Sequence, residues 1–404
     1  MSKIMHYIVF LIFTLNHVSA EEKILGDAFQ DSVPWDISSY LTPIINEYNI
    51  PGMVAAVIRV KGPLAGIATG AAGVRMKGKK EAVTLSDPFH LGSCTKAMTA
   101  TLCALMVEKG YLKWDDRVVD LVPDLASKIH ADYRSLTIKQ LLNHRGGLPA
   151  DLSNIPNLEP GVQHYWQVQN SVPGNNVEGR KIVLEQALSH ASAVKPGTFH
   201  YSNLSYIIVG HILELLRSQK SCDLPWEKMI SEDLFIPLEM KSGGFGPPKE
   251  TDNENPQVPH GHDKSGNPLG TGPEADNPAL LGPAGTVHAS IMDWARFVLL
   301  HLSAQKENYK MLSAKSYKML HTPVTDSDEN NSYAMGWFVH PNKLEHNGSN
   351  GSWYCWVRII PKDSKAILVA CNFAGPKVGE ACEKVITNLS EEPLQYAQFG
   401  EIGD

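Results

Sequence analysis

Hydrophobic runs with strand character lie near both ends of the chain. Two early runs rich in Val, Ile, Ala and Gly are separated by Lys61-Gly62-Pro63, which is the pattern of two strands joined by a turn. Three further runs lie near the C-terminus, and Pro361-Lys362-Asp363-Ser364 forms a polar turn between the last two. The predicted strands are Met53–Val60, Leu64–Val74, Tyr333–His340, Ser352–Ile360 and Ala366–Phe373.

Helical spacing of apolar residues predicts an opening helix in Trp35–Tyr48, ended by Asn49-Ile50-Pro51-Gly52, and a closing helix in Val378–Leu389. Between about 91 and 330 we expect helices and Pro/Gly-rich loops, including Ser242–Gly282. The expected fold is therefore α/β (α+β): an antiparallel sheet built from both chain ends, flanking helices and a large, mostly helical insertion. Such a fold leaves a cleft between sheet and insertion.

The first 20 residues have the pattern of an export signal. Lys3 supplies the positive charge, Tyr7–Leu15 is an apolar core and Val18-Ser19-Ala20 is a small-x-small cleavage site. The alternative is a membrane anchor, but this apolar run is much shorter than the roughly 20 residues that span a bilayer. We expect one domain over 21–396, with a sheet part at about 35–90 and 331–390, a helical part at about 91–330, and a tail at 397–404.

Composition narrows the possible functions. The 404 residues include 36 Lys+Arg and 43 Asp+Glu, a formal net charge of −7, so nucleic acid is not an expected partner. The 6 cysteines are too few and too scattered for a disulfide framework and form no CxxC pair. We expect Cys94, Cys103, Cys355 and Cys371 to be small buried residues rather than bridged ones.

Ser93 and Lys96 form an S-x-x-K motif at the start of an apolar helix. Residues three apart share one face of a helix, so the Ser93 hydroxyl and the Lys96 amine can meet. A desolvated lysine can be neutral enough to take the serine proton and so produce a nucleophile. Alone, the motif also fits an N-capping serine beside a solvated lysine.

Tyr201 and Asn203 follow a Pro196-Gly197 turn, at a loop-to-helix junction where side chains often project into a cleft. A tyrosine can shuttle protons if neighbouring cations lower its pKa, and an asparagine can donate to a carbonyl and accept from an amide. A buried structural tyrosine with a capping asparagine fits the pattern equally well.

His346-Asn347-Gly348-Ser349 lies just before a predicted strand. On an edge strand, a histidine followed by small residues can present an imidazole and backbone N–H groups to an acyl group. The alternative is an ordinary hairpin turn. His260 and His262 resemble half of a zinc motif, but no further ligand completes it, so we expect no metal site and a solvated loop.

Taken in order, S-x-x-K, Y-x-N and H-x-G resemble the serine β-lactamase and penicillin-binding-protein superfamily. The class C branch, with D-Ala-D-Ala carboxypeptidases, family VIII esterases, D-aminopeptidases and LACTB-type proteins, is the most similar. The segments around the motifs, including the block Leu141–Pro149, look like family segments, and the resemblance covers roughly 35–390. We expect His144 and Arg145, in that block, to hold a loop rather than to catalyse.

The resemblance implies a role for each motif residue. Ser93 is the acylated nucleophile, Lys96 and Tyr201 share the proton transfers, and Asn203 orients the substrate. Gly348, Asn347 and Ser349 line the substrate site, and the N–H groups of Ser93 and Ser349 form the oxyanion hole. His346 stands where class C β-lactamases have a lysine, which puts efficient β-lactam hydrolysis in doubt.

The sequence therefore predicts an exported serine hydrolase, periplasmic or extracellular, that needs no cofactor and cleaves a small-molecule or peptide-like ester, D-amino-acid amide or β-lactam. An alternative is a non-catalytic protein that binds a peptide or cell-wall fragment in the same cleft. Another is a zinc hydrolase centred on His260 and His262. Loops such as Asp151–Glu178 and Ser242–Gly282 would select the substrate.

Overall fold

The computed structural model describes residues 35–61, 64–155, 176–218, 224–250, 254–272, 275–303, 311–324, 332–391 and 400–401. The predicted signal at 1–20, the next residues up to 34, and Cys222 lie outside the described residues. Within the described ranges, no helix combines the length and apolar character needed to cross a membrane.

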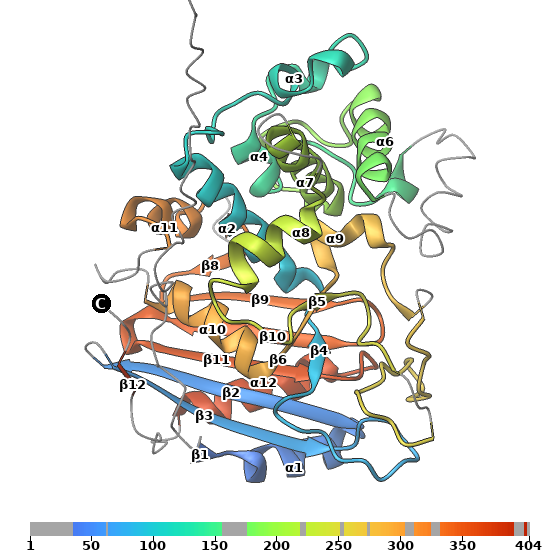
Figure 1. The fold of residues 1–404 in the computed structure, drawn as a ribbon, viewed down its shortest axis with the longest axis vertical. Helices are drawn as coiled ribbons and strands as arrows, with labels where there is room; N and C mark the ends of the chain where they lie inside the picture. Colours follow the sequence, from blue (N-terminus) through green and yellow to red (C-terminus); the bar gives the residue numbers. More distant parts are fainter. Residues whose placement is uncertain are drawn as a thin grey trace, which may run out of the picture.

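The main sheet joins strands from the two ends of the chain, as predicted (Figure 1). Its order is β1-β3-β2-β11-β10-β9-β8-β7, with β12 paired to β3. All pairs are antiparallel except the short parallel pair β1·β3. The strands are β1 (Trp35–Asp36), β2 (Gly52–Lys61), β3 (Leu64–Gly73), β7 (Tyr333–Ala334), β8 (Trp337–His340), β9 (Lys343–Ser349), β10 (Tyr354–Ile360), β11 (Lys365–Cys371) and β12 (Gly400–Glu401).

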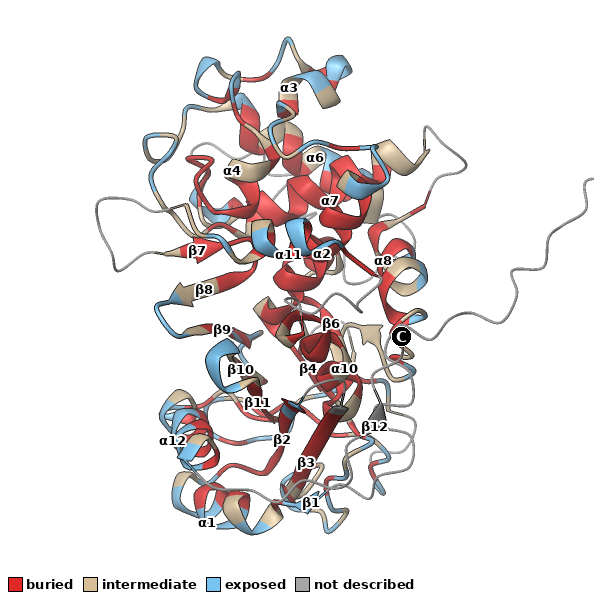
Figure 2. Cartoon of the chain, turned by 90° about the vertical axis from the view of Figure 1, so that its left-hand side faces the viewer, coloured by how far each residue is buried: buried red, intermediate tan, exposed pale blue. Residues whose placement is uncertain are grey.

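Alternation along the central strands gives the sheet two buried faces. In β2, Val54 and Ile58 pack into a large core shared with the helical region, whereas Met53 and Val57 pack into a smaller core on the other face. The smaller core lies under the two terminal helices, α1 (Ser38–Tyr48) and α12 (Val378–Glu391). Figure 2 shows these helices on one side of the sheet.

The helical region covers the opposite face and rises above the sheet (Figure 1). Its helix α2 is buried along most of its length because it lies between the sheet and the surrounding helices. The helices of this region are α2 (Thr95–Glu108), α3 (Val118–Leu121), α4 (Ile138–Leu142), α6 (Asn176–Ser189), α7 (Asn203–Ser218), α8 (Trp226–Ile230), α9 (Gly282–Gly285), α10 (Ile291–Leu302) and α11 (Ala314–His321).

The structure corrects the sequence prediction in several places. The segment that holds His346 is not a turn before a strand but the strand β9, and it lies inside the sheet between β10 and β8 rather than at an edge. A second sheet joins β4 (Pro88–His90), which directly precedes the insertion, to β6 (Val287–Ser290) and β5 (Gly244–Phe245) within it. Within the predicted tail, Gly400–Glu401 pairs with β3.

Candidate active site

The 3₁₀ turn Gly92–Cys94, which leads directly into α2, lies against β9, and two glycines allow this contact. A Cβ on Gly348 would lie 2.0 Å from the Leu91 carbonyl oxygen and 2.9 Å from the Ser93 nitrogen. Gly92 has φ +47°, and a Cβ there would lie 2.4 Å from the Ser349 nitrogen. Only glycine combines this left-handed backbone with such close approach. The nitrogens of Ser93 and Ser349 are thereby brought to one place.

Lys96 lies at the centre of the motif residues. Its amine donates to Ser93 Oγ at 3.1 Å, to Asn203 Oδ1 at 2.8 Å and to the Ala284 carbonyl at 2.7 Å. It also lies 4.9 Å from the centre of the Tyr201 ring. The predicted meeting of Ser93 and Lys96 on one helical face is thus present in the structure, and Ser93 itself stays partly exposed to a reactant.

Burial prepares Lys96 to act as a base. Its side chain is fully buried, and the cost of burying the ammonium lowers its pKa from 10.5 to about 7. The negative charge of Asp151 opposes this change without cancelling it. Lys96 therefore exchanges its proton near neutral pH, which an exposed lysine does not do.

Tyr201 is held by His144 on both sides. The His144 carbonyl accepts the His200 N–H at 2.8 Å, and its ring nitrogen Nδ1 accepts the Ser202 N–H at 3.1 Å. The centres of the His144 and Tyr201 rings lie 4.2 Å apart. His144 thus positions Tyr201, as expected for a loop-holding residue, and Arg145 donates to the carbonyls of Gly197 and Val324.

Tyr201 does not have the lowered pKa that it would need to act as a phenolate base. Burial raises the pKa of Tyr201 well above its ordinary value, and its contact with the Ser93 hydroxyl opposes this only in part. Tyr201 is therefore a neutral hydroxyl near pH 7. It can pass a proton between neighbouring groups, while Lys96 is the group whose pKa suits a base.

Sequence reasoning did not identify Asp151 as a site residue. Its Oδ1 accepts from Asn203 Nδ2 at 2.9 Å, while Asn203 Oδ1 accepts from Lys96. This pair of contacts fixes which end of the Asn203 amide faces the lysine. Asp151 was assigned only to a loop that selects the substrate, because nothing in the sequence pairs it with a residue on α7.

His346 is buried and neutral. Burial, reinforced by the nearby Lys96 charge, lowers its pKa from 6.5 to about 3, and the Asn347 carbonyl, at 2.5 Å from Nδ1, opposes the shift. Nε2 lies 3.1 Å from the Tyr333 hydroxyl, so a neutral ring with the proton on Nδ1 satisfies both contacts. The ring lies near Tyr201, with 6.3 Å between centres. A protonated His346 that anchors a carboxylate does not agree with this environment.

Asn347 is the one predicted site residue that the structure does not bring to the cluster. Because successive side chains of a strand point to opposite faces, Asn347 lies on the other face of the sheet from His346. The residue opposite Asn347 on β10, Trp356, packs against the smaller core. The residue opposite His346, Val357, lies in the larger core. The Asn347 side chain is exposed. Gly348 and Ser349, by contrast, lie against the turn that leads into α2.

The zinc alternative is not supported by the geometry. His260 and His262 are buried, not solvated as expected: His262 Nδ1 contacts the Asn372 carbonyl at 2.6 Å, and its Nε2 accepts the Lys77 N–H at 3.0 Å. The His260 Nδ1 contacts the Leu269 carbonyl. Among the described residues no group of three or more His, Cys, Asp or Glu could hold a metal ion.

The cysteines that the structure describes are free and buried, in agreement with the expectation for Cys94, Cys103, Cys355 and Cys371. Burial raises the pKa of Cys103 and Cys355. Cys94, next to Ser93, is 2% exposed. A thiol so enclosed is a poor competitor for an incoming acyl group.

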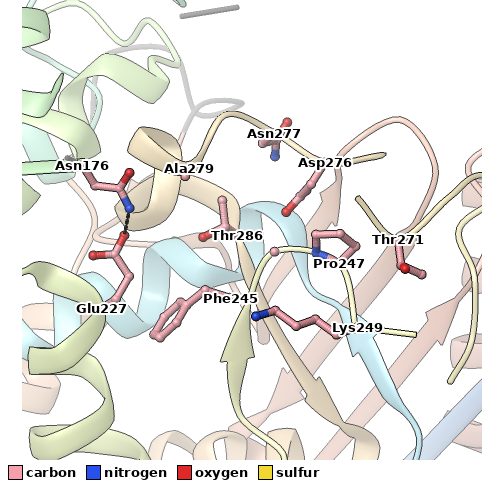
Figure 3. Close-up of a pocket in the computed structure, with 11 residues that line it drawn as sticks. Asn176, Glu227, Phe245, Pro247, Lys249, Thr271, Asp276, Asn277, Ala279 and Thr286 are labelled. Carbon is pink, nitrogen blue, oxygen red and sulfur yellow. Dashed lines mark hydrogen bonds between the residues drawn. The ribbon is translucent and has the colours of Figure 1, made fainter. Parts of the chain in front are cut away.

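A cavity of about 240 Å³ lies between β5 and the segment before α9 (Figure 3). Its wall includes Phe245, Lys249, Thr271 and Asp276. Asp276 contacts His90 and Asn350, which lie near Ser93 and Ser349 in the chain.

Comparison with known proteins agrees with the fold and with the family that the sequence resembles. A family model described as Beta-lactamase matches residues 37–389. Protein flp of Staphylococcus aureus (strain N315) is 26% identical over 331 residues, covering 80% of this chain and 60% of that protein. Penicillin-binding protein 4 of Amycolatopsis lactamdurans is 27% identical over 332 residues, covering 78% of this chain and 79% of that protein.

Among solved structures, the octameric penicillin-binding protein homologue from Pyrococcus abyssi superimposes with a TM-score of 0.67 at 21% identity, covering 88% of this chain and 76% of that one. At this identity the likeness concerns the fold. The chain spans about 60% of the length of the Staphylococcus relatives it matches.

Proposed function

The chain belongs to the Beta-lactamase family, and from this premise we propose that it is a serine hydrolase that works through an acyl-enzyme on Ser93. The observation that carries the proposal is the 3.1 Å contact between Ser93 Oγ and a buried Lys96 whose pKa lies at about 7. A nucleophile beside a base that is partly neutral at working pH is the arrangement that covalent catalysis requires.

In the proposed reaction, neutral Lys96 takes the proton of Ser93 as the hydroxyl oxygen attacks the carbonyl carbon of the donor. The negative charge that develops on the carbonyl oxygen is stabilised by the N–H groups of Ser93 and Ser349. The protonated Lys96 then returns the proton to the leaving group, with the neutral Tyr201 hydroxyl as the intermediary. Water attacks the acyl-enzyme by the same proton transfers in reverse order, which releases the acid and regenerates Ser93.

The charge of the site favours donors without a carboxylate near the reacting bond. His346 is neutral, so it supplies no fixed positive charge at the position where a cation would hold the carboxylate of a β-lactam. Among the three donor classes, we therefore favour an uncharged ester or amide over a β-lactam. Export to the periplasm or the extracellular space is part of the proposal, on the signal pattern at 1–20.

The alternative of a non-catalytic binding protein is less well supported, because Ser93, Lys96, Tyr201 and Asn203 are all present and the first two are in contact. A protein that only binds a ligand has no need to bury a lysine beside a serine at such cost.

Intact mass spectrometry tests the proposal. The protein is exposed in parallel to a fluorophosphonate, a penicillin and a short-chain p-nitrophenyl ester, with and without EDTA. We expect adducts with the fluorophosphonate and the ester, at rates that EDTA does not change. A chelator-sensitive turnover would favour the zinc alternative, and the absence of any adduct would favour the binding protein.

A further inference from the structure

Asp276 is a buried carboxylate that belongs to none of the family motifs. Its side chain is 3% exposed, and one oxygen, Oδ1, makes two contacts. It lies 2.8 Å from His90 Nε2 and accepts from Asn350 Nδ2 at 2.7 Å. These two partners come from segments far apart in the chain, one before α2 and one after β9.

The first partner leads to the nucleophile. His90 Nδ1 accepts the backbone N–H of Gly92 at 3.1 Å, and the other ring nitrogen, Nε2, is the one in contact with Asp276. Gly92 immediately precedes Ser93. The carboxylate thereby fixes the ring that holds the turn carrying the Ser93 N–H.

The second partner leads to the other side of the proposed oxyanion hole. Asn350 follows Ser349, and its Oδ1 accepts from the N–H groups of Ser352 and Trp353, both at 3.1 Å. With its amide nitrogen on Asp276 and its oxygen on this turn, Asn350 has both ends fixed. The carboxylate therefore also holds the turn after Ser349.

We propose that Asp276 is a positioning residue that holds the two backbone N–H donors of the oxyanion hole, those of Ser93 and Ser349, in register with each other. The inference rests on the proposed function. Asn350 makes a hydrogen bond to the carboxylate, of the charge-assisted kind that is about twice as strong as a neutral one, and His90 is in close contact with the same oxygen, so one such group can hold two segments in place. The two segments already touch at Gly92 and Gly348, where no side chain can separate them.

The surroundings of Asp276 make it a suitable site for substitution. Its other oxygen, Oδ2, is buried and has no hydrogen-bond partner among the described residues. Figure 3 shows Asp276 among the residues that line the cavity of about 240 Å³. Shortening the side chain therefore extends a space that already exists, and the fold should tolerate the change.

The experiment measures kcat and KM for a neutral p-nitrophenyl ester, and the rate of fluorophosphonate labelling, in wild type, Asp276→Ala, Asp276→Asn and Asn350→Ala. Loss of one oxyanion-hole donor lowers kcat by about 10² to 10³. Misplaced donors still make weakened hydrogen bonds, so misplacing both should lower kcat by less, on the order of 10 to 10². We expect Asp276→Ala to lower kcat and labelling by this factor with KM nearly unchanged. Asp276→Asn, which keeps an acceptor at Oδ1, should recover most of the rate.

Asp276 and Asn350 should also behave as one unit. Asn350→Ala should resemble Asp276→Ala, and the double variant should be no slower than either, because both remove the same restraint. Glu227→Gln, a carboxylate on the wall of the same cavity but on α8 and outside the substrate-selecting loops, is the matched control and should leave kcat unchanged.

A kcat within twofold of wild type in folded Asp276→Ala, or losses that multiply in the double variant, would overturn the inference. If Asp276→Ala does not fold, an unchanged kcat in Asn350→Ala would overturn it equally. If wild type forms no adduct at all, the proposed function fails and the inference with it; if wild type labels normally, only the inference is at stake.

Discussion

Replacing Lys96 with arginine tests whether Lys96 acts as a base or only as a positive charge. With a pKa of about 7, about half of the Lys96 side chains are neutral at pH 7, whereas at 10.5 roughly one in 3,000 would be. The shift corresponds to about 5 kcal/mol against the charged form. An arginine keeps the charge, but its neutral fraction at pH 7 is below about one in 10⁵.

We therefore expect Lys96→Arg to lose about 10² to 10⁴ in kcat/KM, the range for a positioned proton-transfer group, and to be nearly as slow as Lys96→Ala. The assay is hydrolysis of a neutral p-nitrophenyl ester between pH 5 and 10. In wild type, kcat/KM should rise with pH through about 7, because the deprotonated lysine is the working form.

Lys365→Arg is the matched control, since Lys365 is also buried and donates to a backbone carbonyl, that of Ser390, but lies on β11 away from the cluster. It should keep wild-type kcat/KM and pH dependence. The reasoning would be refuted if Lys96→Arg kept more than about a tenth of wild-type kcat/KM, or if the wild-type rise were centred near pH 10.

Three further substitutions and one comparison of two substrates test other parts of the site. Tyr201→Phe should lose about 10² to 10⁴ in kcat/KM for the same ester, and a loss below about threefold would reduce Tyr201 to a packing role. Asp151→Asn removes a negative charge that raises the pKa of Lys96, so the rise of kcat/KM should move to lower pH; an unmoved or higher midpoint contradicts this. A penicillin should be a poor substrate, and what turnover it shows should have the same pH dependence of kcat/KM as a neutral ester between about 5 and 8, because His346, with a pKa of about 3, stays neutral throughout. A separate fall for penicillin through about 6.5 would instead support His346 as a cationic anchor. Gly348→Ala should abolish labelling, because its Cβ would lie 2.0 Å from the Leu91 carbonyl, and normal labelling would show that the contact between α2 and β9 is not required.

Much of the sheet could be predicted from hydrophobic runs bounded by turn residues, but the strand that carries His346 could not. In β9 the inward positions are Leu344, His346 and Gly348, so only one of three is apolar and the periodic signal disappears. His346 and Gly348 occupy inward positions where a buried strand usually has hydrophobic residues. Asn-Gly within this segment also gave a false turn signal.

The environment of each group depends on tertiary contacts that spacing does not encode. The motifs identified Ser93, Lys96 and Tyr201, but Asp151 meets Asn203, and Asp276 meets His90 and Asn350, only after folding. Whether His346 is charged, and whether Tyr201 can ionise, depend on burial, which the sequence alone does not give.

The central claim is that Ser93 carries the acyl group. The most direct measurement is tandem mass spectrometry of the peptide that contains residues 93–96 after fluorophosphonate labelling of wild type, Ser93→Ala and Cys94→Ala. The account predicts an adduct on Ser93 in wild type and in Cys94→Ala, and none in Ser93→Ala, whose melting temperature should match wild type. An adduct that persists in Ser93→Ala, or that disappears in Cys94→Ala while both proteins stay folded, would contradict it.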